Sequence, residues 1–544
     1  MKTKTFLLLL LAQLPLAHAQ TQWVLQPYLQ YFGHVRGSAL GARVKGFVGS
    51  KPNNPYNIAV ASSPSNNNPT GLSFYSISTP QDTTPLWIIP YGADVEDGDF
   101  NGDGYTDFAV WKSVNMGRNS SVLIYLGDAA GIDTVAAIEL TEEQERSGFG
   151  LKMCIGDLNN DGNDDLVITA PGYAVSLGNN GKVYAYFGDP NMNSTPDFTI
   201  TGSRPYAGFG SRCAIGDFND DGFNDLAIRG YDQARIGGSE SFGYLNIYLA
   251  SAQVDTIADL TSPRAGRGAG TSGGLAAFDA NADDKTDLLW TYSDSLTSQN
   301  FVYIHFGGAD FAQRFQVAPD FVIPAPFGSG EFGNEIANAG DMNGDGDEDI
   351  LIAAYSTGQE NGIVFVYTAG KALDDKFDAA RGQSRGGNFG ASIDGVGDVN
   401  HDGYDDIIVG APLQPWSRYE GYFGIFWGDA RIPTHVAERN SETPPADFIL
   451  GPIYPNPLTS HSTIEFKLSK RAFVETKVYN LLGKEVIAFP EVEYLAGQHR
   501  VVWNSRDRDG EIVPSGIYFV RMRAFASDHS HLLFEQTNKF MVVR

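Results

Sequence analysis

Asp99-Phe100-Asn101-Gly102-Asp103-Gly104-Tyr105-Thr106-Asp107 is the stretch of sequence that decides the fold. Side-chain oxygens stand at its positions 1, 3, 5 and 9, a glycine stands at position 6, and position 7 can offer its backbone carbonyl. Alternate residues of a tight loop turn inward, so these oxygens can converge on one point. Because Ca²⁺ takes about 6–8 oxygen ligands, the stretch predicts a calcium loop that Asp107 closes.

The same nine-residue frame occurs six times in the chain. A single copy would suit an ordinary acidic turn, but six copies in one frame argue for metal binding at about five or six Ca²⁺ sites. The candidate ligands at positions 1, 3, 5, 7 and 9 are, loop by loop, Asp99, Asn101, Asp103, Tyr105 and Asp107; Asp157, Asn159, Asp161, Asn163 and Asp165; Asp217, Asn219, Asp221, Phe223 and Asp225; Asp279, Asn281, Asp283, Lys285 and Asp287; Asp341, Asn343, Asp345, Asp347 and Asp349; and Asp398, Asn400, Asp402, Tyr404 and Asp406.

One copy of the loop departs from the others. The loop that begins at Asp279 has Asp284 at position 6, where a positive φ is expected and glycine is the favoured residue. Lys285 at position 7 adds a positive charge beside the expected cage. We therefore expect this site to bind calcium most weakly.

The loops mark a long structural repeat. Their first aspartates are separated by 58, 60, 62, 62 and 57 residues, and each loop is surrounded by short β-branched or aromatic runs. About four such runs in each unit of about 60 residues predict the blades of a β-propeller. Residues 40–75 repeat the pattern without a cage, since Gly49–Pro55 replaces the aspartates, which gives seven blades. The segment Trp23–Leu29 could supply the missing fourth strand of the last blade and so close the ring.

Recurrent motifs around the loops identify a known repeat. An aromatic-glycine pair precedes the loop, as in Phe149-Gly150 and Phe389-Gly390, and Gly410-Ala411-Pro412 follows the last one. In this order the motifs resemble FG-GAP repeats of the integrin α-subunit kind. The resemblance implies a seven-bladed propeller with Ca²⁺ on one face and ligand recognition on the other face or at an edge. Six candidate cages exceed the three or four that are usual in integrins and resemble bacterial members more.

The composition excludes several functional classes. The 544 residues include 42% hydrophobic residues, enough for a large core, and the net charge of −27 argues against a nucleic-acid partner. The two cysteines, Cys154 and Cys213, lie three and four residues before the first aspartates of their loops. Because this opposite parity points them to opposite faces of equivalent strands, we expect two buried thiols rather than a disulfide.

Composition also divides the chain. Residues 1–19 combine a basic start, a short apolar run and Ala17-His18-Ala19, which predicts a secretory signal peptide. We expect the propeller over 20–435, a linker over 436–448 and a further domain over 449–544. The chain shows no transmembrane segment.

The last hundred residues differ in charge and pattern from the rest. Residues 446–544 hold 12 Lys and Arg against 11 Asp and Glu, and runs such as Gly516–Arg523 alternate apolar with polar residues. This pattern predicts a small antiparallel β-sandwich, so the whole chain is expected to be all-β. Tyr454-Pro-Asn-Pro457, Pro514–Phe519 and Lys539–Arg544 resemble the C-terminal sorting domain of type IX secretion cargo. The resemblance implies the outer-membrane secretion machinery as a partner and a place on or outside the surface of a Gram-negative bacterium.

Catalytic motifs are scarce, because almost all acid pairs belong to the expected metal loops. We therefore expect a monomeric adhesion or ligand-binding module for an extracellular protein or glycan, rather than an enzyme. Contacts from Tyr231–Arg235 or Trp416–Tyr419 are the candidates for recognition. The alternative is a secreted, calcium-dependent polysaccharide hydrolase or lyase with a site built from blade loops.

Overall fold

The computed structural model of the chain divides into two compact units, Met1–Thr434 and His435–Arg544. It describes residues 23–432 and 449–542, apart from 26, 33–38, 48–53, 63–70, 78–83, 115–118, 177, 205, 234–240, 251–255, 263–272, 294–299, 327–330, 355–361, 371–372, 383–386, 414–419, 455–461, 469–471, 482, 490–491, 495–496, 504, 509–510 and 526–531. The expected signal peptide, the linker and most of Gly49–Pro55 therefore lie outside the described residues.

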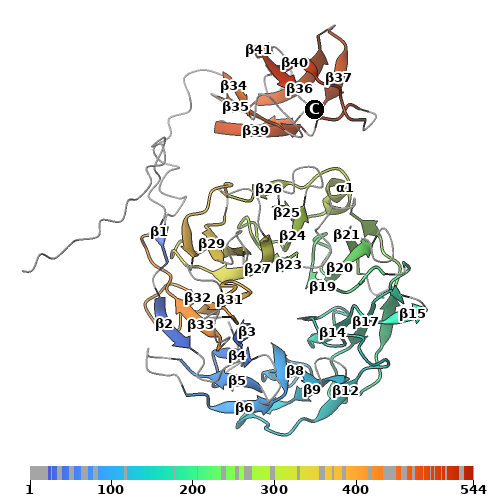
Figure 1. The fold of residues 1–544 in the computed structure, drawn as a ribbon, viewed down its shortest axis with the longest axis vertical. Helices are drawn as coiled ribbons and strands as arrows, with labels where there is room; N and C mark the ends of the chain where they lie inside the picture. The colour runs from blue at the N-terminus through green and yellow to red at the C-terminus, as the bar shows by residue number, and fades with distance from the viewer. Residues whose placement is uncertain are drawn as a thin grey trace, which may run out of the picture. The chain divides into compact units, whose positions relative to one another are not determined.

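The described part of the first unit contains seven sheets of four or five strands, which we call blades 1 to 7 (Figure 1). Blades 1 to 3 contain β3 (Leu40–Gly46), β4 (Ile58–Ser62), β5 (Gly71–Tyr75) and β6 (Trp87–Pro90); β7 (Gly92–Gly98), β8 (Asp107–Val114), β9 (Asn119–Tyr125) and β12 (Ile138–Thr141); and β13 (Met153–Gly156), β14 (Asp165–Ala170), β17 (Lys182–Tyr186) and β18 (Phe198–Thr201). Blades 4 and 5 contain β19 (Arg212–Gly216), β20 (Asp225–Gln233), β21 (Ser241–Tyr248) and β22 (Leu260–Thr261); and β23 (Leu275–Phe278), β24 (Asp287–Ser293), β25 (Asn300–His305) and β26 (Phe321–Pro324).

Blades 6 and 7 each take one strand from the N-terminal segment. Blade 6 contains β27 (Phe332–Gly340), β28 (Asp349–Ala354), β29 (Ile363–Tyr367), β30 (Ala379–Gly382) and β1 (Trp23–Val24); blade 7 contains β31 (Ser392–Gly397), β32 (Asp406–Gly410), β33 (Tyr422–Phe426) and β2 (Pro27–Phe32). Small additions are the two-stranded sheets β10 (Gly127–Asp128) with β11 (Gly131–Ile132) and β15 (Ala174–Ser176) with β16 (Gly178–Asn179), and helix α1 (Phe311–Phe315), whose phenylalanines pack near His305.

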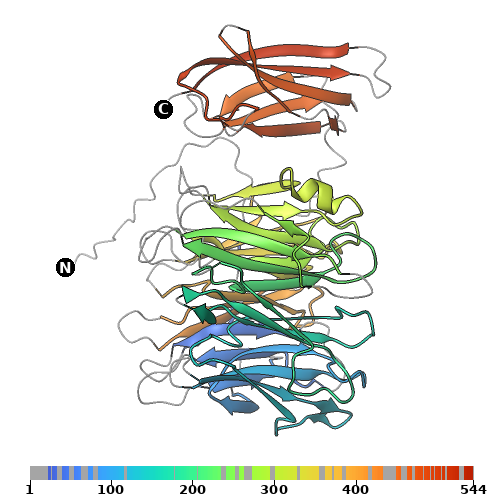
Figure 2. The same ribbon diagram turned by 90° about the vertical axis from the view of Figure 1, so that its right-hand side faces the viewer.

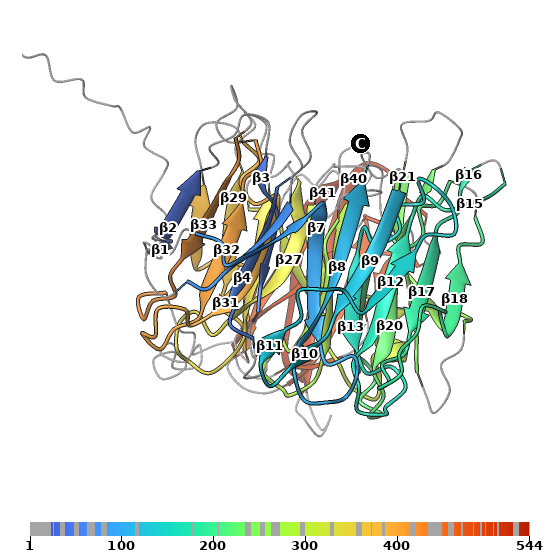
Figure 3. The same cartoon turned by 90° about the horizontal axis from the view of Figure 1, so that it is seen from below.

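The first strands of the blades form a closed ring. Each contacts the first strand of the next blade, from β3 through β7, β13, β19, β23 and β27 to β31, and β31 contacts β3 again. Edge-on, the strands of this unit lie side by side between two faces that carry the connections (Figure 3). The predicted all-β propeller is confirmed.

The ring is closed by strands from opposite ends of the unit. β2 pairs antiparallel with β33 as the fourth strand of blade 7, which confirms the expectation that the N-terminal segment completes the last blade. The first part of the expected segment Trp23–Leu29 does not join blade 7, because Trp23 and Val24 form β1, which pairs in parallel with β30 at the edge of blade 6. Ser392 and Asp394 of blade 7 also accept hydrogen bonds from the backbone N–H groups of Val44 and Gly46.

The hydrophobic core lies between neighbouring blades. Second strands such as β14 are buried along their whole length, as the continuous apolar run predicts. Phe149 is fully buried and meets Tyr184 edge to face, with ring centroids 5.2 Å apart. Gly150 has a φ of +87°, and a Cβ there would lie 2.3 Å from Trp111. The aromatic-glycine pair thus fills the space between blades 2 and 3, where the side chain of Trp111 leaves no room for a Cβ at Gly150.

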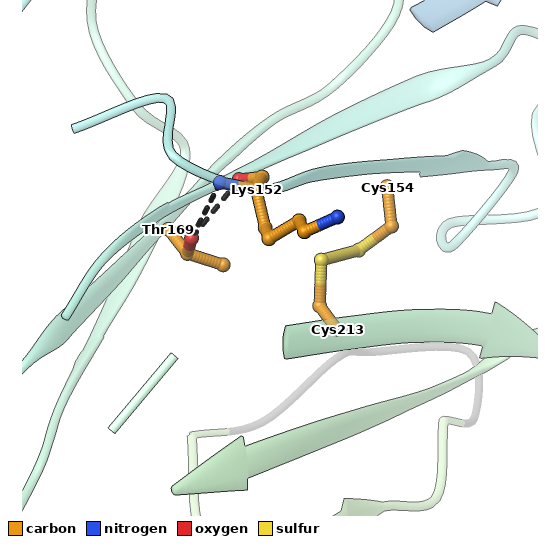
Figure 4. Close-up of a disulfide and its surroundings, with 4 residues drawn as sticks. All are labelled: Lys152, Cys154, Thr169 and Cys213. Carbon is orange, nitrogen blue, oxygen red and sulfur yellow. Dashed lines mark hydrogen bonds between the residues drawn. A yellow bond between two sulfur atoms is a disulfide. The ribbon is translucent and has the colours of Figure 1, made fainter. Parts of the chain in front are cut away.

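The expectation of two free thiols is wrong, because Cys154 and Cys213 form a disulfide with their Cα atoms 6.0 Å apart (Figure 4). Cys154 pairs in register with Val167, whereas Cys213 pairs with Ile228, so the parity of the two positions is opposite as expected. Neighbouring blades, however, turn opposite faces toward each other. Opposite parity therefore brings the two thiols into the same core between blades 3 and 4.

The described residues of the second unit form two sheets (Figure 2). One contains β34 (Ile449–Tyr454), β35 (Ser462–Leu468) and β39 (Gly497–Trp503); the other contains β36 (Ala472–Asn480), β37 (Glu485–Ala488), β38 (Val492–Tyr494), β40 (Gly516–Phe525) and β41 (Leu532–Val542). Both sheets contribute to one core, which includes Phe466, Trp503 and Tyr518. The predicted small β-sandwich is confirmed.

Candidate metal loops

Each candidate loop joins the first strand of its blade to the second. The loop 99–107, for example, runs from the end of β7 to Asp107, the first residue of β8. The loops of blades 3 to 7 occupy the same place. Because all the first strands run in the same direction around the ring, the six loops lie on one face of the propeller.

Position 9 of every loop is an anchor for the backbone. Asp107 is fully buried, and its two carboxylate oxygens accept hydrogen bonds from the N–H groups of Phe100 at 2.9 Å and Gly127 at 2.7 Å. The same two bonds recur at Asp165, Asp225, Asp287, Asp349 and Asp406, which are also fully buried. This carboxylate ties the loop to the end of the third strand, a role that the loop motif alone does not reveal.

Positions 1, 3 and 5 come together around one backbone N–H group. In blade 2 the N–H of Asp103 donates to Oδ1 of Asp99 and to Oδ1 of Asn101, both at 3.0 Å. The amide nitrogen of Asn101 in turn donates to Oδ2 of Asp103 at 3.0 Å. The loops of blades 3, 4 and 6 repeat these three bonds.

Position 7 is held by its own backbone. The N–H of Tyr105 donates to Oδ1 of Asp103 at 2.9 Å. The equivalent bonds fix Asn163, Phe223, Lys285, Asp347 and Tyr404.

The donor chemistry of the loops fits a hard cation. Positions 1, 3, 5 and 9 present only oxygen ligands. Burial above all raises the pKa of Asp107 to about 7, and the carboxylates of Asp103 and Asp99 act in the same direction. The amide of Asn400, at position 3 of the blade 7 loop, is buried with neither its oxygen nor its nitrogen hydrogen-bonded. A cation would relieve both the crowding of carboxylates and this unpaired oxygen.

The geometry stops short of a formed cage. Among the residues that the structure describes, no group of three or more His, Cys, Asp and Glu side chains is arranged to hold a metal ion. The loop oxygens instead accept hydrogen bonds from the backbone of their own loops. Calcium binding at the six loops is therefore a proposal rather than an observation.

The blade 5 loop differs from the other five in its geometry. Asp284 adopts a φ of +64° in place of glycine. The amide of Asn281 donates to Asp287 at 3.3 Å, whereas in blades 2, 3, 4 and 6 the equivalent amide donates to position 5. Lys285 extends to the neighbouring loop, where its ammonium lies 2.6 Å from Asp220.

Neighbouring loops are also joined directly. Asp99 donates its N–H to the carboxylate of Asp164, at position 8 of the next loop, at 2.8 Å, and its carbonyl accepts the N–H of Asp164 at 3.0 Å. Asp341 and Asp405 form the same pair of bonds in blades 6 and 7.

The structure describes only part of the segments that we expect to recognise a ligand. Tyr231 is half-buried in β20, whereas Ala234, Arg235 and Trp416–Tyr419 lie outside the described residues.

Comparison with known proteins identifies both units. FG-GAP repeats match residues 149–186, 332–367 and 389–427, which cover most of blades 3, 6 and 7. A secretion system C-terminal sorting domain matches residues 452–533 in the second unit. This domain indicates export by the type IX system to the cell surface or into the surroundings. Within the described ranges no helix has the length and apolar character needed to cross a membrane.

Several curated proteins resemble part of this chain. Integrin alpha-5 of Xenopus laevis is 34% identical over 164 residues, which cover 29% of this chain and 15% of that protein. Integrin alpha-IIb of Mus musculus is 32% identical over 170 residues, which cover 28% of this chain and 16% of that protein. The human phosphatidylinositol-glycan-specific phospholipase D is 26% identical over 346 residues, 57% of this chain and 33% of the enzyme. The chain thus spans less than a fifth of the length of these integrins.

A solved bacterial surface protein aligns with most of the chain. PorZ, a surface component of the type IX secretion system of Porphyromonas gingivalis, aligns over 92% of this chain and 61% of its own with a TM-score of 0.36 and 14% identity. A likeness this slight supports no inference about function.

Proposed function

Because the chain carries three FG-GAP repeats and a type IX sorting domain, we propose that it is an exported, calcium-stabilised propeller that binds an extracellular protein or glycan. The observation that carries the calcium part is the recurrence of one loop geometry. In blades 2, 3, 4 and 6 the side chains at positions 1, 3 and 5 surround the same backbone N–H group.

The residues that would hold the ion are those of positions 1, 3, 5 and 9, with the carbonyl of position 7. Bound Ca²⁺ supplies the positive charge that these crowded carboxylates lack. Position 9 already links the loop to the third strand through its two backbone bonds, so an ordered loop holds three segments of the blade together. An ion that binds only this folded arrangement stabilises the propeller by mass action.

The binding part of the proposal follows from where the chain is exported and how its blades are connected. The blade connections lie on two exposed faces, and loops carried by a rigid scaffold are the usual place for recognition. The FG-GAP repeats lie in the propeller unit and the sorting domain lies in the second unit, so we place ligand binding in the propeller.

Calorimetric titration of the purified full-length chain with CaCl₂, with thermal melts in calcium and in chelator, tests the calcium part. We expect about five or six ions and a large rise in melting temperature. Asp161→Asn, at an exposed position 5, should remove about one ion, whereas Glu145→Gln, an exposed carboxylate outside the loops, should remove none. A melt indifferent to chelator would overturn this part.

Glycan and protein arrays, probed in calcium and in chelator, test the binding part. Retention of a ligand without release of new reducing ends supports the binding module. New reducing ends from a bound polysaccharide would instead establish the alternative, a hydrolase or lyase.

A further inference from the structure

The blade 5 loop carries its own positive charge. Its position 7 is Lys285, whereas the other five loops have tyrosine, asparagine, phenylalanine or aspartate there. The Lys285 ammonium group lies 2.6 Å from the carboxylate of Asp220, at position 4 of the blade 4 loop. The carboxylates of Asp283 and Asp310 also attract this ammonium group. A cation that belongs to the chain thus stands among carboxylates at this loop.

The oxygen ligands of the blade 5 loop are not gathered as they are elsewhere. In blades 2, 3, 4 and 6 the N–H of position 5 donates to the side chains of positions 1 and 3. In blade 5 the N–H of Asp283 donates to Asp279 at 3.2 Å, and the amide of Asn281 donates to Asp287 at 3.3 Å. Asn281 therefore turns an N–H group, which repels a cation, toward the carboxylate that would close the cage.

The backbone of this loop also departs from the others. Asp284 at position 6 has a φ of +64°, whereas the glycines at position 6 of the other five loops have φ values between +86° and +92°. The turn that leads to the carbonyl of position 7 is therefore different in blade 5. Its residues fit Ca²⁺ less well than those of any loop that gathers positions 1, 3 and 5.

The Lys285 ion pair joins two neighbouring blades. Blades 4 and 5 are adjacent in the ring (Figure 1). At the junction of blades 3 and 4, the link comes from position 8, where the amide of Asn224 donates to the carbonyl of Asp157 at 3.0 Å. Blade 5 has Thr286 at position 8, and its link to the preceding loop is the bond from Lys285 to Asp220.

We propose that the blade 5 loop takes no Ca²⁺, and that the Lys285 ammonium group replaces the ion as a built-in cation joining the loops of blades 4 and 5. The part that concerns ion number rests on the proposed function, since it presumes calcium at the other five loops. An ammonium group beside the cage repels a second cation. Because it is part of the chain, a chelator cannot remove it, so this junction stays linked when calcium is scarce.

Calorimetric titration of the full-length chain with CaCl₂ tests the assignment. We expect the wild type to bind one ion for each of the other five loops. Asp283→Asn, at position 5 of the blade 5 loop, should leave this number unchanged, whereas Asp161→Asn, the same change in blade 3, should remove about one ion. Asp284→Gly combined with Lys285→Asn gives the loop the residue types of blade 3 at positions 6 and 7, and should add about one ion.

Thermal melts in chelator test the bridge without calcium. Lys285→Gln removes the ammonium group and should lower the melting temperature in chelator by about 1–3 °C. Lys376→Gln is the matched control, because Lys376 is an exposed lysine outside the loops, and it should leave the melting temperature unchanged.

The outcomes separate this inference from the calcium proposal. Loss of an ion in Asp283→Asn, or a folded double variant that gains none, would overturn the assignment of blade 5. Equal melting temperatures for Lys285→Gln and wild type in chelator would overturn the bridge. If the wild type binds no ion at all, the calcium proposal fails, and the melts in chelator alone decide whether Lys285 joins the two loops.

Discussion

Replacing Lys152 with methionine should stabilise the protein near neutral pH, although it removes one partner of an ion pair. Burial, together with Arg43 and Arg212, lowers the pKa of Lys152 to about 8 even though Glu335 acts in the opposite direction. The Lys152 amine therefore binds its proton less tightly in the native state than in the unfolded chain. Methionine keeps most of the length and apolar contacts of the side chain without its charge.

The size of the effect follows from the two pKa values. A pKa of about 8 in the folded state, against about 10.4 in an unfolded chain, corresponds to roughly 3 kcal/mol. The side chain keeps 19% of its surface exposed, so solvent screens part of this cost. We expect Lys152→Met to raise the free energy of unfolding at pH 7 by about 1–3 kcal/mol.

The pKa of Lys152 also predicts how the free energy of unfolding changes with pH. Between about pH 8 and pH 10 the unfolded chain binds more protons at this lysine than the native state does. The wild-type protein should therefore gain stability from Lys152 as the pH rises through this window, and Lys152→Met should lack that gain.

Urea unfolding followed by tryptophan fluorescence, at about pH 7 and about pH 9.5 in saturating calcium, measures both effects. Arg212→Met is the matched control: it removes the partner that lies 2.8 Å from Glu335, and it should destabilise by about 1–3 kcal/mol. The reasoning is refuted if Lys152→Met is less stable than wild type at pH 7 and shows the same rise with pH.

Three further changes test the fold and the loops. Asp225→Ala removes a fully buried acceptor of two backbone bonds and should cost about 2–4 kcal/mol even in chelator, whereas Asp221→Asn should lower the melting temperature only in calcium; melts under both conditions separate the two roles. Replacing Cys154 and Cys213 by serine should cost about 2–5 kcal/mol, and reductant should lower the melting temperature of the wild type but not of this variant. Deleting residues 20–32 removes β1 and β2 and exposes the edge of β33, so size-exclusion chromatography should show association that the intact chain lacks.

The repeat could be predicted from the sequence because each blade carries its own local signals. The Asp-x-Asn-x-Asp-Gly loop fixes the turn between the first two strands, and runs such as Asp165–Ala170 become strands buried on both faces. The position of β2 in blade 7 could also be predicted, because the last repeat has only three strand-like runs and needs a fourth strand from elsewhere in the chain.

The remaining features depend on how blades meet, which no single repeat reveals. The structure confirms that Cys154 and Cys213 point to opposite faces of their own sheets. The conclusion of two free thiols was wrong because neighbouring blades pack with opposite faces together, which brings the two cysteines into contact. The anchor bonds of Asp107 join residues 7 and 20 positions away, so the loop motif alone could not suggest them. Glu335 meets Arg212 across 123 residues of sequence, and only the closed ring brings the two together.

The pairing of β2 with β33 sets an order of events for folding. A chain is synthesised from its N-terminus, so β2 is made first, but the strand that β2 must join is made near the end of the unit. The backbone N–H of Val44 likewise cannot form its hydrogen bond until Ser392, 348 residues later, is present. Contacts of such long range form slowly, and until they form the first strands expose unpaired edges. The seam that makes the finished ring durable therefore makes its closure the last step of folding.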